Sequence, residues 1–198
     1  MIRPRQSFIQ LREDPKALGQ GLKAILLIGG LYTFTVTGLA LVDAEIMAPG
    51  VLKIPGEAYY FWEIFFTLPV MISGWILAAG IIQLLSRAFQ GRGTFEVTLA
   101  LLGFAITLPM FMTWIPETIG TIIFLTGLAT HEQWVTLATE TSFGKVFNWV
   151  YQLLFLIWLM ILVPLAVSIA QKLRLYVAAG IGFLSLIIFM AFVLVFIR

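Results

Sequence analysis

Few side chains in this 198-residue sequence have the types and spacing that chemistry requires. The chain has no cysteine and a single histidine, His131, which excludes disulfides, thiolate-bound zinc, iron–sulfur clusters and a bis-histidine haem within it. His131 and Glu132 are followed by Gln133 and Trp134, so the spacing of a zinc-protease motif is missing. Phosphate-binding loops and serine-nucleophile motifs are also absent. We therefore expect no catalytic residue, no metal site and no bound cofactor.

Four polar residues are the remaining candidates for a shared site: Glu63, Glu117, Asn148 and Gln152. Asn148 and Gln152 are four residues apart and therefore lie on one face of a helix. Ionisable groups inside a membrane are a default functional hypothesis, and this polar cluster would open outward to admit a small solute. The same residues are also typical of hydrogen bonds between helices, each worth about 0.6 kcal/mol. A proton relay through the bilayer centre lacks its residues.

The composition identifies the class of protein that carries these residues. Hydrophobic residues make up 61% of the chain and charged residues only 11%, whereas soluble domains carry about 25% charged residues. A soluble enzyme cannot bury so much apolar surface, so that class is excluded. The formal net charge of +2 is too small to indicate a nucleic-acid partner. We predict an integral membrane protein that is not an enzyme.

The length of the apolar stretches predicts how often the chain crosses the membrane. A spanning helix needs roughly 20 mainly apolar residues, because the hydrocarbon core is about 30 Å thick. The runs are continuous rather than alternating, which favours helices over a barrel. We predict an all-α bundle of five spans, preceded by a polar segment over 1–23. The spans cover 24–42, 59–85, 98–114, 146–170 and 175–197.

The stretch 119–129 is too short to be a span of its own. It is either a short interfacial helix or an extension of the third span, and the pattern leaves both open. A sixth span through this region would place His131 and Glu132 in lipid, which costs several kcal/mol. We therefore expect five spans.

The distribution of charge predicts the orientation. Nine of the twelve basic residues fall in the N-terminal segment, between the second and third spans, or between the fourth and fifth spans. Seven of the ten acidic residues fall on the opposite side, in the alternate connections or, for Glu63, about one turn into the second span. Cytoplasmic loops carry the excess of lysine and arginine, so we expect the N-terminus in the cytoplasm and the C-terminus outside. The nine residues are Arg3, Arg5, Arg12, Lys16, Lys23, Arg87, Arg92, Lys172 and Arg174.

The N-terminal segment carries its own helix signals. Phe8 and Leu11 share one face of the stretch from Ser7 to Glu13, which predicts a short helix on the cytoplasmic membrane surface. Asp14 followed by Pro15 predicts the start of the next helix, with Asp14 as its N-cap. The basic residues here either orient the chain or also attract anionic lipid, at about 1 kcal/mol each.

Small residues recur at helical spacing within three of the predicted spans. Such stripes let helix backbones approach closely, either within the bundle or between chains. We therefore expect membrane lipids, and other membrane protein chains or further copies of this chain, as partners. The stripes contain Gly29, Thr33 and Thr37, then Gly74 and Ala78, then Ala178 and Gly182.

Three parts of the sequence resemble a known family. The opening stretches Pro4–Phe8 and Leu11–Pro15 resemble the start of prokaryotic Yip-domain proteins. The connection between the second and third spans looks like the glycine, basic, small residue, phenylalanine turn of that family. The segment from Leu102 to Phe104, with Pro109, is similar to the family's following helix. The family-like turn consists of Gly91, Arg92, Gly93, Thr94 and Phe95.

The resemblance implies five spans, a cytoplasmic N-terminus and the cytoplasmic (inner) membrane of a bacterium or archaeon. Eukaryotic members bind Rab-type GTPases and help to shape vesicle membranes. Their aspartate-leucine-tyrosine-glycine-proline motif is absent here, so the resemblance does not carry GTPase binding to this chain. We expect a non-catalytic scaffold, adaptor or accessory subunit. The alternative is a channel or transporter for a small solute.

Overall fold

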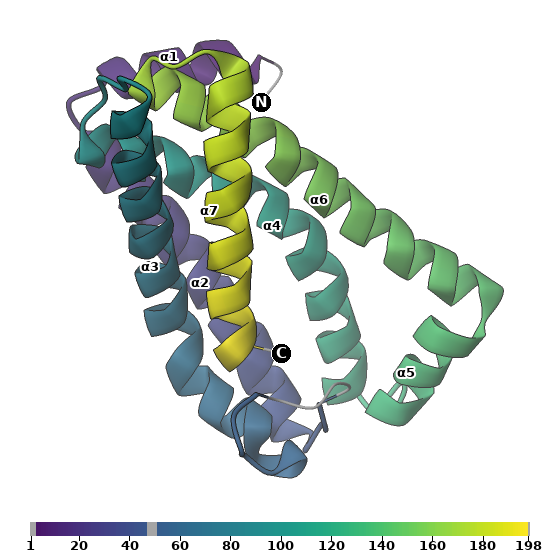
Figure 1. Ribbon diagram of the computed structural model, residues 1–198. Helices are drawn as coiled ribbons and strands as arrows, with labels where there is room; N and C mark the ends of the chain where they lie inside the picture. The colour runs from purple at the N-terminus through teal and green to yellow at the C-terminus, as the bar shows by residue number, and fades with distance from the viewer. Residues whose placement is uncertain (1–2, 47–50, 198) are drawn as a thin grey trace.

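The computed structural model describes residues 3–46 and 51–197, and all regular elements in these ranges are helices (Figure 1). Five of the helices are long and apolar enough to cross a membrane. This confirms the prediction of an all-α bundle with five spans. The helices are α1 (Pro4–Glu13), α2 (Ala17–Leu41), α3 (Gly56–Ala88), α4 (Phe95–Leu125), α5 (His131–Glu140), α6 (Ser142–Gln171) and α7 (Leu175–Phe196).

The five long helices form a ring. Each packs against its neighbours in the order α2, α4, α6, α7, α3 and back to α2, and α3 also touches α4 across the ring. The chain runs up and down the bundle, so α1 lies across one end and α7 finishes toward the other (Figure 1). Ile82, Leu101, Ile106 and Leu162 are among the fully buried side chains of the core. We call the two ends the α1 end and the α5 end.

Threonine side chains cap three of the helices. The Oγ1 of Thr94 accepts a hydrogen bond from the backbone nitrogen of Val97 at 3.4 Å and so caps α4. Thr141 caps α6 in the same way. Thr130 and Gln133 form a reciprocal capping box at the start of α5. Each cap satisfies a backbone donor that has no partner inside the helix.

The third span is longer than the sequence pattern predicts. The predicted span ends at Trp114, whereas α4 continues without interruption to Leu125 and includes Pro109 and Pro116. The stretch 119–125 is therefore an extension of the third span and not a separate interfacial helix. Proline is tolerated inside membrane helices because neighbouring helices and threonine hydroxyls satisfy the freed backbone groups.

The N-terminal region contains the predicted short helix, but the next helix starts differently from the prediction. The prediction of Asp14 as N-cap was wrong, because Lys16 occupies that position and α2 begins at Ala17. The Asp14 carboxylate accepts hydrogen bonds from the backbone nitrogen of Lys16 and from Nε2 of Gln20, both at 2.7 Å. It thus stabilises the turn between α1 and α2. Helix α2 begins at Ala17, seven residues before the predicted start of the span at 24. Its first turns contain polar residues, which a search for apolar runs leaves out.

The α5 end is more open than the α1 end. α5, which the sequence pattern did not reveal, packs against the start of α6, and this pair leans away from α4 (Figure 1). Large apolar side chains on several faces of this half of α6 are exposed, including Phe147, Trp149 and Leu153. Apolar side chains exposed on a membrane-spanning helix are suited to contact with lipid or other membrane helices.

Two glycines let α2 and α4 touch backbone to backbone near the α1 end. A Cβ atom added at Gly21 would lie 2.7 Å from the Cα of Ala100. One added at Gly103 would lie 2.7 Å from the carbonyl oxygen of Gly21. Any side chain at either glycine therefore forces the two helices apart.

We predict that Gly21→Ala lowers the thermal stability of the protein in detergent, by about 1–3 kcal/mol, because the methyl group has no space. Gly19→Ala is the matched control, since an added Cβ there meets no atom within 4 Å. The control should leave the melting temperature unchanged or raise it slightly, because alanine favours helix. Tryptophan fluorescence during heating provides the measurement. Equal melting of the two variants would contradict the close crossing.

Candidate functional site

Three polar side chains from three spans meet inside the α1 end. Gln171, the last residue of α6, is 0% exposed. Its Nε2 donates hydrogen bonds to Oε1 of Gln83 on α3 and to Oγ1 of Thr98 on α4, each at 2.6 Å. A buried amide is costly unless it is hydrogen-bonded, so these contacts hold the ends of α3, α4 and α6 together. We call Gln83, Thr98 and Gln171 the glutamine network.

The family-like turn lies against this network. The backbone nitrogen of Gly93 donates to Oε1 of Gln171 at 3.3 Å, and the backbone oxygen of Gly93 accepts from Nε2 of Gln83 at 3.1 Å. The backbone nitrogen of Arg92 donates to the backbone oxygen of Gln171 at 3.0 Å. The connection between α3 and α4 is thus bonded to the end of α6, far away in the sequence.

The glycines of the turn are required by this close contact. A Cβ atom at Gly93 would lie 2.1 Å from the backbone oxygen of Ala170, and one at Gly91 would lie 2.9 Å from that of Ser86. The side chains of Arg92 and Thr94 point to the surface and are exposed. The glycine-basic-glycine pattern therefore reflects a backbone packed directly against α6 and the end of α3.

The sequence reading identified the turn but missed all three side chains of the glutamine network. Gln83 and Gln171 each lie near the end of an apolar span. A polar residue at such a position usually marks the point where the helix leaves the membrane and enters water. Thr98 lies in the first turn of the next span. One signal could have revealed the network. Gln83 and Gln171 both lie near the ends of predicted spans, and these ends are on the same side of the membrane as the glycine-rich turn.

The predicted polar cluster at the α5 end is distributed over three helices. Asn148 and Gln152 share a face of α6, and Oδ1 of Asn148 accepts a hydrogen bond from Nε2 of Gln152 at 3.0 Å. Glu63 is completely buried on α3, and Glu117 is exposed on α4. The two amides therefore form one hydrogen-bonded unit, while the two carboxylates lie in different environments.

Three tyrosines that the sequence reading did not include lie within electrostatic range of Glu117. Its carboxylate interacts electrostatically with the hydroxyl groups of Tyr32 on α2, Tyr60 on α3 and Tyr151 on α6. Tyr60 also interacts with Glu63 in this way. Tyr32 is held in place by a hydrogen bond with the hydroxyl of Thr113. The polar groups of this half of the bundle thus face one another across several helices.

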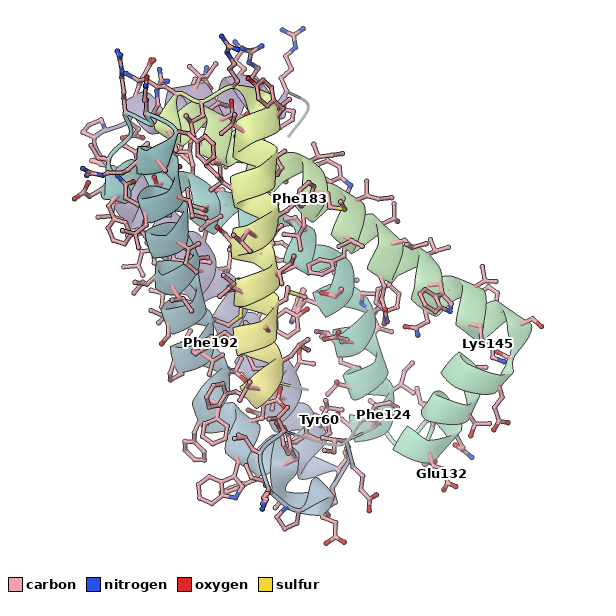
Figure 2. All side chains as sticks on the ribbon, in the orientation of Figure 1. Tyr60, Phe124, Glu132, Lys145, Phe183 and Phe192 are labelled. Atoms are coloured by element: carbon pink, nitrogen blue, oxygen red, sulfur yellow. The ribbon has the colours of Figure 1, made fainter. Side chains whose placement is uncertain are left out.

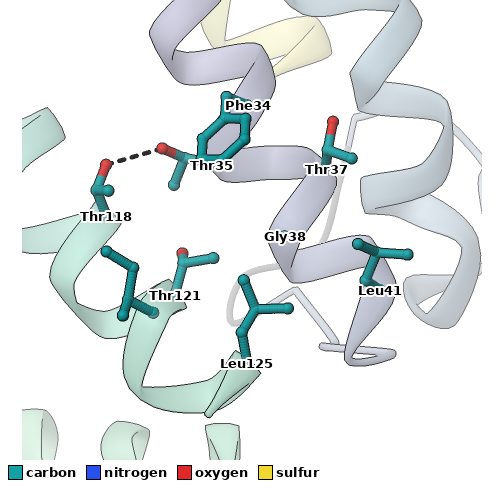
Figure 3. A pocket seen from close by; sticks show the side chains of 9 residues that line it. Phe34, Thr35, Thr37, Gly38, Leu41, Thr118, Thr121 and Leu125 are labelled. Atoms are coloured by element: carbon teal, nitrogen blue, oxygen red, sulfur yellow. Dashed lines mark hydrogen bonds between the residues drawn. The ribbon is translucent and has the colours of Figure 1, made fainter.

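A small crevice lies between α2 and α4 in the same half of the bundle (Figure 3). The hydroxyls of Thr35 and Thr118 hydrogen bond at 2.8 Å on one side of it, and Nε1 of Trp114 donates to Thr35 Oγ1 at 3.1 Å. Its remaining walls are mainly apolar, and its volume is about 80 Å³. Sites for small molecules are usually about 300–1,000 Å³, so this crevice does not hold a metabolite.

The predicted packing glycines all face other helices of the same chain. A Cβ atom at Gly29 would meet Leu68 of α3, one at Gly74 would meet Phe189 of α7, and one at Gly182 would meet Val163 of α6. These stripes therefore serve contacts within the bundle, a choice that the sequence left open.

The other members of the stripes have simpler roles. Ala78 and Ala178 are buried in the main core. Thr33 and Thr37 each donate a hydrogen bond to the backbone oxygen four residues earlier, at 2.8 and 2.7 Å. Among the side chains that the structure describes, no group of three or more acidic residues could hold a metal ion.

Comparison with known proteins identifies one family. The family model of the Yip1 domain matches residues 1–197, which is nearly the whole chain. The match confirms the resemblance that the N-terminal motif and the turn Gly91–Phe95 indicate. No curated protein and no solved structure matches the chain.

We predict that Gln171→Leu destabilises the α1 end. The substitution leaves the backbone nitrogen of Gly93 and the side chains of Gln83 and Thr98 without their buried partner, at about 1–3 kcal/mol for each unsatisfied group. Gln152→Leu, at an exposed position of the same helix, is the matched control and should change stability little. Hydrogen exchange of residues 89–95 and the melting temperature provide the measurement. Unchanged protection of this turn in Gln171→Leu would contradict the role of the network.

Proposed function

The chain belongs to the Yip1-domain family, and from this premise we propose that it is a scaffold, adaptor or accessory subunit in a membrane. It is a multi-pass membrane protein by its five long apolar helices and its family. The family is not a known enzyme family. We infer that the protein works through its surfaces and not through a reaction.

The observation that carries this proposal is the hydrogen-bonded α1 end. The glutamine network joins α3, α4 and α6, and α1 packs across α4 and α6 with Phe8 completely buried. Nη1 of Arg12 donates to the backbone oxygen of Ile169 at 3.5 Å, which attaches α1 to α6. Nitrogen atoms of basic side chains gather over this end (Figure 2). A charged surface carried by helices that are hydrogen-bonded to one another is suited to binding a partner of opposite charge.

We propose that the α1 end faces the cytoplasm of a bacterium or archaeon, because the basic residues gather there. The absence of cysteine allows a direct test with single-cysteine variants. Arg174→Cys, just before α7, should react with a membrane-impermeant maleimide only in inside-out vesicles. Glu140→Cys, at the end of α5, should react only in right-side-out vesicles. Labelling of both variants in the same vesicle preparation would contradict five spans, and the reverse pattern would contradict the orientation.

The α5 end supplies a second surface for a partner. The exposed apolar residues of α6 can pack against lipid, against another membrane protein or against a second copy of this chain. The short helix α5 extends this surface beyond the ring. We propose that membrane-protein partners pack against the half of α6 that exposes Phe147, Trp149 and Leu153.

A transporter is the alternative function, and one observation favours it. Glu117 faces tyrosines from three other helices, and Asn148 and Gln152 lie on the α6 half that leans away from α4. An arrangement of this kind could line a path for a solute. Against it, the crevice between α2 and α4 is not lined by Glu117, Asn148 or Gln152.

We predict that the purified protein in liposomes raises the flux of K⁺, Na⁺ and glycerol no more than protein-free liposomes do. Protein-mediated flux that Glu117→Gln abolishes, and that the exposed control Glu57→Gln retains, would establish the transporter instead. Purification in mild detergent complements this test. The scaffold proposal expects a stoichiometric partner chain or a defined oligomer. A monomer without a partner that conducts solute would reject it.

A further inference from the structure

A groove at the α1 end lies outside both the glutamine network and the polar cluster. It runs between α1 and the junction of α6 and α7, and its volume is about 540 Å³. Three basic side chains line it: Arg5 and Arg12 from α1 and Lys172 from the end of α6. Lys172 has a left-handed backbone, with φ of 55°, at the point where α6 ends. Residues far apart in the sequence thus place three positive charges around one space.

The charges in this groove are largely available to a ligand. Arg5 and Lys172 are exposed, and within the described residues neither side chain forms a hydrogen bond or ion pair. Arg12 donates to the backbone oxygen of Ile169 and forms an ion pair with Glu13 at 3.2 Å. A guanidinium has five donors, so Arg12 keeps donors beyond these two contacts. With Glu13 included, the groove retains an excess of positive charge that favours an anion.

Apart from Ser168, whose hydroxyl donates a hydrogen bond to the backbone oxygen of Leu173 at 2.7 Å, the rest of the groove is lined by apolar residues and extends along α6. Leu165 and Ile169 lie on α6, and Leu175 begins α7. At 1.5 Å of rise per residue, Leu165 lies about 10 Å deeper in the span than Lys172. The groove therefore presents cations at the level where a span leaves the membrane and aliphatic side chains below them. A soluble anion would contact only the cations and would not use the aliphatic side chains.

We propose that this groove binds one anionic phospholipid of the surrounding leaflet. The phosphate contacts Arg5, Arg12 and Lys172, and an acyl chain lies along Leu165 and Ile169. Arginine recognises phosphate through paired hydrogen bonds, and basic side chains at a membrane surface attract anionic headgroups. The proposal does not depend on whether the protein is a scaffold or a transporter. It assigns a bound lipid to the position where α1 meets the transmembrane bundle.

The test is lipid binding by the full-length protein in detergent, followed by native mass spectrometry. Phosphatidylglycerol and phosphatidylcholine with identical acyl chains are the probes. Arg5→Gln/Lys172→Gln removes two groove charges that have no hydrogen-bond or ion-pair partner among the described residues. It should weaken the tightest phosphatidylglycerol site on the order of tenfold and leave phosphatidylcholine binding unchanged. The matched control, Lys23→Gln/Arg87→Gln, removes two exposed charges that do not line the groove and should retain the site.

A gain-of-binding variant excludes misfolding as the explanation. Glu13→Gln removes the carboxylate that competes for Arg12 and should tighten phosphatidylglycerol binding several-fold, whereas Glu96→Gln should not. Inorganic phosphate at millimolar concentration should not displace the lipid, because it cannot use the apolar wall. The proposal would be overturned if the two double variants lost phosphatidylglycerol binding equally, or if Arg5→Gln/Lys172→Gln lost none. It would also be overturned if Glu13→Gln gained no phosphatidylglycerol binding, or if phosphate displaced the lipid.

Discussion

The hydrogen bonds of the buried Gln171 amide determine the arrangement of one end of the molecule. An amide inside a helix bundle must find partners, and this one bonds Gln83 on α3, Thr98 on α4 and the backbone of Gly93. The connection between α3 and α4 can reach these partners only because it has glycine where it meets Ala170. With the three spans joined, their ends form a platform on which α1 packs, and the groove beside Lys172 follows from that packing.

The two ends of the bundle therefore differ in character. At the α1 end, the polar side chains of the glutamine network bond to one another within the chain, and basic side chains lie exposed on the surface. At the α5 end, α6 leans away from α4 and exposes apolar side chains on several faces. A protein built in this way offers two distinct surfaces, one charged and one apolar. The scaffold role that we propose would use both surfaces, whereas a transporter needs an enclosed path for a solute.

Sequence reasoning succeeded where the property is local. A span is recognised from the length of its apolar run, so all five were found, and the short helix predicted over Ser7–Glu13 from its apolar face lies within α1. Predicted boundaries were less accurate. The predicted third span ends at Trp114, yet α4 continues through Pro116 to Leu125. Asp14 has the composition of an N-cap, but its carboxylate instead bonds Lys16 and Gln20 in the preceding turn.

What the sequence alone determined was the class of protein, the number of its spans and the family turn, since each depends on residues close together in the chain. Only the tertiary structure decided which polar residues act together. Gln83 and Gln171 are separated by 88 residues, and Arg5 and Lys172 by still more, yet each pair lies together at the α1 end. Helix packing sets these distances through backbone contacts such as that between Gly21 and Gly103. No periodicity within a single span can reveal which face of another helix it will meet.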